Sequence, residues 1–227
     1  MQRMKKILVV SAVVVACLLL VALVGALILW RAALVVPDFY AQALAASETT
    51  RREHSDAMLQ KTITLVGDVR RSGEWEALFT EAEINGWLAV DLVENHSQSL
   101  PPEVADPRIV VTDGGLLMGC RARTGGVETV LSLAVDAYLT EPNVLALRVR
   151  SARAGAIPLP LGDVLDQIAA TAHRSGMRVQ WQQAGGDPVA LVRLNWEVKD
   201  RPVIVESLEV GSGEIYLAGS THEPEKE

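Results

Sequence analysis

The chain has 227 residues, of which 49% are hydrophobic, and a formal net charge of −7. This length is enough for one well-formed hydrophobic core and too short for two comfortable ones. An acidic chain of this kind is repelled by nucleic acid and by bulk anionic lipid, so neither is expected as a general partner. The two cysteines, Cys17 and Cys120, form no disulfide framework, and we expect Cys120 to be a buried, inert thiol.

The run 7–30 contains no charged side chain over 24 residues. As an α-helix it would be about 36 Å long, enough to cross a hydrocarbon core of about 30 Å. It is too long for the apolar region of a cleavable signal peptide, and no small-residue cleavage site follows it. We therefore expect a transmembrane helix at 7–30, with Trp30 at the interface. Cleavage and lipidation at Cys17 are the alternatives.

The basic residues around this run predict its orientation. Arg3, Lys5 and Lys6 lie in the leader 1–6, whereas only Arg31 directly follows the run. The positive-inside rule then places the N-terminus in the cytoplasm and the rest of the chain outside the inner membrane. Without the leader, the 18 Lys and Arg and 28 Asp and Glu of the exported part give a net charge of −10.

A long helical pattern runs from 37 to about 69, with Pro37 suited to its first turn. Apolar residues recur intermittently along it, but residues 47–53 are polar on all sides. We expect a juxtamembrane helix or stalk over 31–70, either with a stalk portion or with a kink in this polar middle.

A second helix has a specific start. Thr80 and Glu83 fit a capping box, and Phe79 and Ile84 are placed as its hydrophobic staple. Glu81 and Glu83 also suggest a carboxylate pair for acid–base chemistry. Capping explains Glu83, and compensation of the helix dipole explains Glu81, so we favour the structural interpretation.

After residue 102 the apolar residues recur with a period of two, which is typical of half-buried strands. Turn sequences separate the expected strands 108–112, 116–123, 127–139, 144–153, 178–182, 189–196, 203–210 and 214–218. A helix after Pro160 with its stop at Gly176 interrupts them. The order predicts an α+β domain over 71–220, an antiparallel meander sheet packed with two shorter helices. The tail 221–227 is expected to be disordered.

Enzyme signatures are mostly absent. The four histidines, His54, His96, His173 and His222, have no second ligand at metal-binding spacing. No nucleophile elbow or phosphate-binding loop is present either. We therefore predict a protein that is not an enzyme, with no catalytic residue, no cofactor and no metal.

Four arginines form the candidate site, as a patch for an anionic ligand: Arg121, Arg123, Arg148 and Arg150. They alternate in pairs along two expected strands, so the guanidinium groups would share one sheet face if those strands are near neighbours. The alternative is a solvated face paired with Glu128 and Asp136. Apolar strands against helices also suggest either a groove for an acyl chain or a packed core.

Two short segments carry a resemblance: FTEAEINGWL at 79–88 and GAIPLP at 155–160. With the single anchor, they resemble uncharacterised bacterial single-pass proteins of YpmS-like layout, and loosely the exported domains of the tubular lipid-binding type. The resemblance implies a long helix and a curved antiparallel sheet that encloses apolar ligands. Neither segment carries chemistry, so no functional residue is transferred.

Two functions follow from these patterns. The first is a membrane-anchored extracytoplasmic binding module for lipid or another apolar ligand. The alternative is a structural or assembly protein of the cell envelope that docks protein partners through its long helix. A cavity that opens toward the membrane would favour the first, and an exposed apolar stripe on residues 37–69 the second. The oligomeric state does not follow from the sequence.

Overall fold

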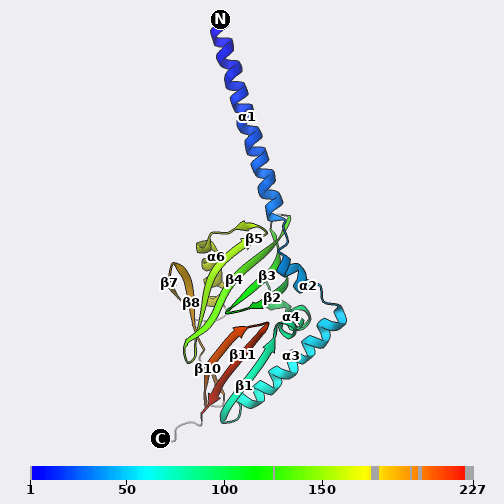
Figure 1. The fold of residues 1–227 in the computed structure, drawn as a ribbon, viewed down its shortest axis with the longest axis vertical. Coiled ribbons are helices and arrows are strands. Elements are labelled where there is room, and N and C mark those ends of the chain that lie inside the picture. The colour runs from blue at the N-terminus through cyan, green and yellow to red at the C-terminus, as the bar shows by residue number, and fades with distance from the viewer. Residues whose placement is uncertain (1, 125, 175–178, 195, 199–200, 223–227) are drawn as a thin grey trace.

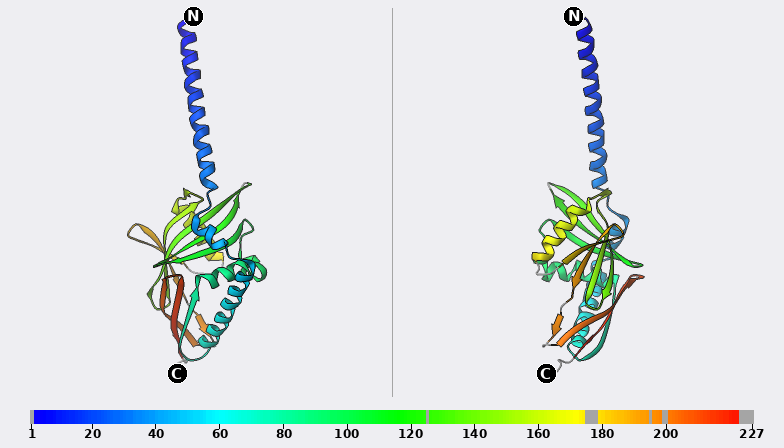
Figure 2. Two further views of the ribbon diagram at one scale, coloured as in Figure 1. Left: turned by 45° about the vertical axis from the view of Figure 1, so that its right-hand side comes forward. Right: turned by 90° about the vertical axis from the view of Figure 1, so that its left-hand side faces the viewer.

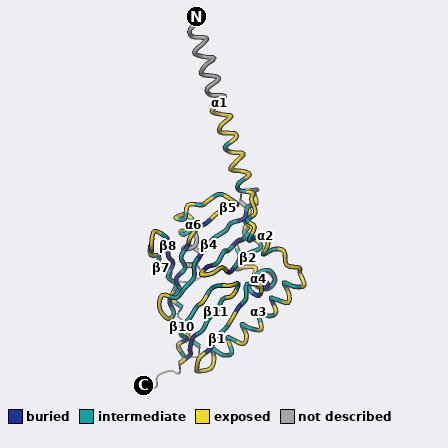
Figure 3. Tube along the Cα trace, in the orientation of Figure 1, coloured by how far each residue is buried: buried dark blue, intermediate teal, exposed yellow. Residues whose placement is uncertain are grey.

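The computed structural model describes residues 2–124, 126–174, 179–194, 196–198 and 201–222. Helix α1 (Gln2–Ala33) projects from a body formed by the rest of the chain (Figure 1). Among the described residues, one helix near the N-terminus is long and apolar enough to cross a membrane. In Figure 3 most residues of this helix whose burial is described are exposed, while buried residues gather mainly in the strands of the body.

The helix expected over 37–69 is two helices, α2 (Asp38–Leu44) and α3 (Glu48–Val69). Ser47 is extended and accepts a hydrogen bond from the amide of Thr50 at 3.2 Å. A serine that caps a helix in this way begins a new helix instead of continuing the old one. The expected kink is therefore a complete break, and α3 leaves α2 in a new direction (Figure 2).

The capping box is confirmed at the start of α4 (Glu81–Ala89). The Thr80 hydroxyl accepts from the Glu83 amide at 3.3 Å, and the Glu83 carboxylate accepts from the Thr80 amide at 2.9 Å. The chain then turns at Val90 into α5 (Asp91–Asn95) and a 3₁₀ turn, η1 (Ser97–Ser99).

The larger sheet has seven antiparallel strands in the order β2-β3-β4-β5-β8-β7, with β6 paired to β5. Its strands are β2 (Val104–Thr112), β3 (Gly115–Thr124), β4 (Val127–Glu141), β5 (Val144–Ala154), β6 (Ile157–Pro158), β7 (Val179–Ala184) and β8 (Asp187–Arg193). The expected meander is thus present in β2 to β5. Helices α2 and α6 (Leu161–Arg174) lie on opposite sides of this sheet (Figure 2). The expected stop at Gly176 lies outside the described residues.

A second, four-stranded sheet has the order β1-β11-β10-β9. It consists of β1 (Gly73–Thr80), β9 (Trp196–Val198), β10 (Arg201–Gly211) and β11 (Glu214–Thr221). Strand β1 is not among the strands predicted from the sequence, and the predicted strand 189–196 is divided between the two sheets. Leu65 and Val69 of α3 pack against the buried Trp75, Val203 and Val205 of this sheet.

The expectation of a disordered tail from residue 221 is wrong at its first residue. Thr221 is 1% exposed, ends β11 and donates its hydroxyl to the Val69 carbonyl at 2.9 Å. Strand β11 lies between β1 and β10, so both of its edges are paired and its last residue is held in the sheet. Residues 223–227 lie outside the described residues.

Candidate functional site

The C-terminal end of α1 is bonded to the larger sheet. The Thr129 hydroxyl donates to the Ala33 carbonyl at 2.6 Å, and the Ala156 amide donates to the Ala32 carbonyl at 2.8 Å. The last carbonyls of a helix lack donors within the helix, so these bonds supply the Ala32 and Ala33 carbonyls with donors from the sheet side. They also fix the end of α1 against the start of β4 and the turn after β5.

Gly155 makes this close approach possible. It has a positive φ of 59°, and a Cβ at this position would lie 2.5 Å from the carbonyl oxygens of both Ala32 and Ala33. Only glycine combines this backbone conformation with the missing side chain. The junction between α1 and the sheet therefore depends on residue 155.

A groove lies beside the junction, on the α2 side of the larger sheet, with a volume of about 320 Å³. We call it the junction groove. Its wall is Val35, Pro37 and Phe39, from the segment that follows α1 and from the first turn of α2. Its floor comes from the three central strands β3, β4 and β5, chiefly through Leu117, Ser132, Ala134, Ser151 and Arg153.

The strand register explains why these floor residues share a face. Leu117 lies opposite Ala134, which lies opposite Ser151 on β5. One step along the same face, Ser132 lies opposite Arg153. Directly opposite residues of antiparallel strands project to the same side. The floor therefore presents one apolar end and one polar end carrying a guanidinium group.

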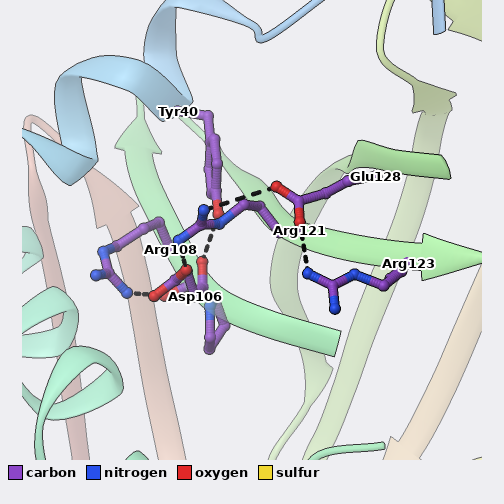
Figure 4. A network of polar contacts seen from close by, with 7 residues as sticks. Tyr40, Asp106, Arg108, Arg121, Arg123 and Glu128 are labelled. Carbon is purple, nitrogen blue, oxygen red and sulfur yellow. Dashed lines mark hydrogen bonds and ion pairs between the residues drawn. The ribbon is translucent and has the colours of Figure 1, made fainter. Parts of the chain in front are cut away.

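A polar network holds α2 on the strands at one side of the groove (Figure 4). The Tyr40 hydroxyl donates to the Asp106 carbonyl at 2.7 Å, and Arg121 forms an ion pair with the Asp106 carboxylate. Burial, reinforced by that carboxylate, raises the pKa of Tyr40 above its ordinary value of 10.0, so the phenol stays protonated and able to donate. Glu128 joins Arg121 to Arg123 with contacts of 3.7 and 3.1 Å.

Arg108 completes this network from below α2. It is 2% exposed and donates from Nη1 to the Pro107 carbonyl at 2.6 Å. Its Nε has no hydrogen-bond partner within the described part of the chain. Burial lowers the pKa of Arg108, and the nearby Asp106 carboxylate opposes this shift. The network thus keeps a buried cation beside a single carboxylate.

The four arginines of the predicted patch lie on β3 and β5, which are separated by β4. Arg121 is opposite Val130 and Arg148 opposite Asp136 on β4, a separation of about 20 Å along a strand. Arg150 pairs with Asp136 at 2.6 Å and with Asp187 at 3.4 Å. The arginines are therefore two groups, and three of them bind carboxylates as the solvated-face alternative expects. An anionic-ligand role for these four residues stays a prediction.

A serine, a histidine and a glutamate also meet in the smaller sheet, which the sequence spacing did not indicate. The Ser220 hydroxyl donates to Glu206 at 2.5 Å and lies 3.2 Å from His222 Nε2. Ser220 is 7% exposed, and its proton is directed to the carboxylate instead of the imidazole. In a Ser–His–acid triad the serine donates to the imidazole and the imidazole donates to the acid, so these three residues are not arranged as that triad. The contact fixes the irregularity of β10 at Glu206.

The Cys120 thiol is partly buried. Burial raises the pKa of Cys120, which keeps the thiol protonated. Among the described residues, no three His, Cys, Asp or Glu side chains gather in a way that could hold a metal ion. The junction groove is one place where a ligand can contact several elements of the fold.

Comparison with known proteins finds no match. No family model fits the chain, and no curated protein or solved structure shows significant similarity to it.

Proposed function

We propose that the chain is a membrane-anchored binding module that holds the apolar part of a lipid in the junction groove, outside the cell membrane. The observation that carries this proposal is the bonding of α1 to the sheet through Ala32 and Ala33. The groove wall begins two residues later at Val35, so the groove lies directly beside the end of the anchor.

The length of α1 supports a position of the groove among lipid head groups. From residue 7 to Ala33 the helix rises about 40 Å, which matches a bilayer of about 40–45 Å including its head groups. Leu34, Val35 and Val36 are 45%, 46% and 49% exposed. Exposed apolar residues at this depth would contact lipid instead of water. The basic leader supports a cytoplasmic N-terminus, so the body would be extracytoplasmic.

The test uses the full chain in mild detergent with native mass spectrometry. The parent protein should retain one phospholipid, and Ser151→Trp should lose it because the indole fills the groove floor. Ser207→Trp is the matched control, since Ser207 is also a half-buried serine, on a central strand of the other sheet. Lipid retention that survives Ser151→Trp with an unchanged melting temperature would refute the groove as the site.

A second candidate function is envelope assembly through α3, and one observation favours it. Ile63 and Val66 are 71% and 43% exposed, and residues three apart are neighbours on a helix surface. Exposed apolar neighbours of this kind mark sites of protein contact. Cross-linking in cells should then trap a partner that Ile63→Ser with Val66→Ser no longer captures, while lipid retention is unchanged.

A further inference from the structure

We propose that the junction groove selects lipids with a net anionic phosphate head group, which Arg153 binds together with the hydroxyls of Ser132 and Ser151. This inference rests on the proposed function and adds a head-group subsite to the apolar part of the groove.

Arg153 differs from the other exposed arginines of the central strands. Arg121, Arg123 and Arg150 each contact at least one carboxylate. Within the part of the chain that the structure describes, Arg153 forms no ion pair, although it is exposed and lines the groove. A cation without a counter-ion in an acidic protein is a place where an external anion compensates charge.

The two serines give this cation the surroundings of a phosphate site. Ser132 lies directly opposite Arg153 in the β4–β5 register, where facing Cβ atoms are about 5 Å apart. Ser151 is two residues before Arg153 on β5 and therefore projects to the same face. The planar guanidinium matches phosphate through paired N–H donors, and hydroxyls supply further donors to the remaining oxygens.

The groove also lacks what a zwitterionic head group needs. None of its lining residues is acidic, so it offers no carboxylate to the quaternary ammonium group of phosphatidylcholine. The apolar residues Val35, Phe39 and Leu117 are placed for the acyl chain. The chemistry of the groove therefore fits a lipid with a phosphate and no compensating cation.

The experiment compares two lipids with identical acyl chains on the full-length protein in mild detergent. Equimolar phosphatidylglycerol and phosphatidylcholine are added, and native mass spectrometry counts the lipid that is retained. Both lipids offer a phosphate to Arg153, but only phosphatidylcholine also brings a cation close to the guanidinium, so the parent should favour phosphatidylglycerol by about tenfold. Arg153→Gln should abolish this preference, and Arg153→Lys should restore part of it. Arg150→Gln, three residues away and paired outside the groove, should leave it unchanged.

The outcomes separate the two proposals. Lipid retained without a head-group preference overturns the anionic subsite and leaves the binding module standing. A preference that survives Arg153→Gln overturns the subsite, because Arg153 would then not be its source. A preference that Arg150→Gln abolishes equally also overturns it, because net charge would then explain the preference. A parent protein that retains no lipid overturns the binding module and the subsite together.

Discussion

The side-chain carboxamide of Asn85 hydrogen-bonds both main-chain groups of Ile109. Its oxygen accepts from the Ile109 amide at 2.9 Å, and its nitrogen donates to the Ile109 carbonyl at 2.8 Å. Ile109 lies on β2, the edge strand of the larger sheet, so Asn85 takes the place of a further strand. Glu81, one helical turn earlier on α4, accepts from the Val111 amide at 2.8 Å.

The spacing of these contacts explains how a helix covers a strand edge. Four residues on a helix rise about 6 Å, and two residues along a strand span about 6.6 Å. The side chain of Glu81 therefore reaches Val111 while the side chain of Asn85 reaches Ile109. This geometry gives Glu81 a structural role in place of the acid–base role that its sequence position also suggested.

Asn85→Ala is expected to lower the free energy of unfolding by about 1–3 kcal/mol, because it leaves the two main-chain groups of Ile109 without partners. Thermal unfolding of the full chain in detergent, followed by circular dichroism, measures the effect. Gln60→Ala removes a carboxamide from an exposed position and should change little. Equal effects of the two substitutions would show that α4 does not protect the strand edge.

The Glu83 carboxylate is expected to make stability depend on pH. Burial would raise its pKa, but hydrogen bonds from Lys61 and from the Thr80 amide outweigh burial and lower it below the ordinary 4.5. Its contribution is therefore full above about pH 4.5 and is lost as the pH falls through the lower folded-state pKa. Glu83→Gln should unfold with a flatter pH profile between pH 5 and 3, in denaturation titrations at about 0.5-unit steps. A parallel loss in the parent and the variant would contradict this.

Gly155→Ala is expected to destabilise the junction more than an ordinary glycine substitution. At Gly126, which also has a positive φ, of 82°, an added Cβ meets nothing within 4 Å. Gly126→Ala should therefore cost only backbone strain, about 1 kcal/mol, whereas Gly155→Ala should cost about 2–3 kcal/mol. Melting temperatures of both variants provide the comparison. Equal losses would mean that the contact with α1 is dispensable.

The orientation of the anchor is expected to be cytoplasmic at the N-terminus, because Arg3, Lys5 and Lys6 precede the apolar run. A reporter enzyme that works only in the cytoplasm should be silent when fused after Glu227. Changing the three basic residues to Gln should increase its activity. Full activity of the reporter in the parent fusion would reverse the proposed localisation.

Local sequence signals predicted many of the helices and strands of this fold, but little of how the strands pair with one another. The capping box at Thr80 and Glu83 depends on residues three apart, and the structure confirms it. Strand β1 was missed because its partner β11 lies at the opposite end of the domain sequence. No periodicity of the eight residues of β1 reveals such a distant partner.

The candidate site shows the same division between local and distant information. Alternation along β3 and β5 correctly located the arginines in strands, but the order of strands decides which carboxylates they meet. A register shift between Ala134 and Val135 further alters the match of β4 to β5. Arg153 becomes a candidate ligand-binding residue only because it lines the same groove as Val35 and Phe39. These two wall residues lie more than a hundred positions earlier in the sequence.

The junction between α1 and the larger sheet, formed by Ala32, Ala33, Thr129 and Gly155, also has a mechanical consequence. Two hydrogen bonds join the end of α1 directly to the larger sheet, so a rotation of the helix would move the body with it. In a bilayer, a thicker membrane would change the tilt of the helix. The body would then tilt with the helix relative to the membrane surface. The depth of the groove among the lipid head groups would then follow membrane thickness.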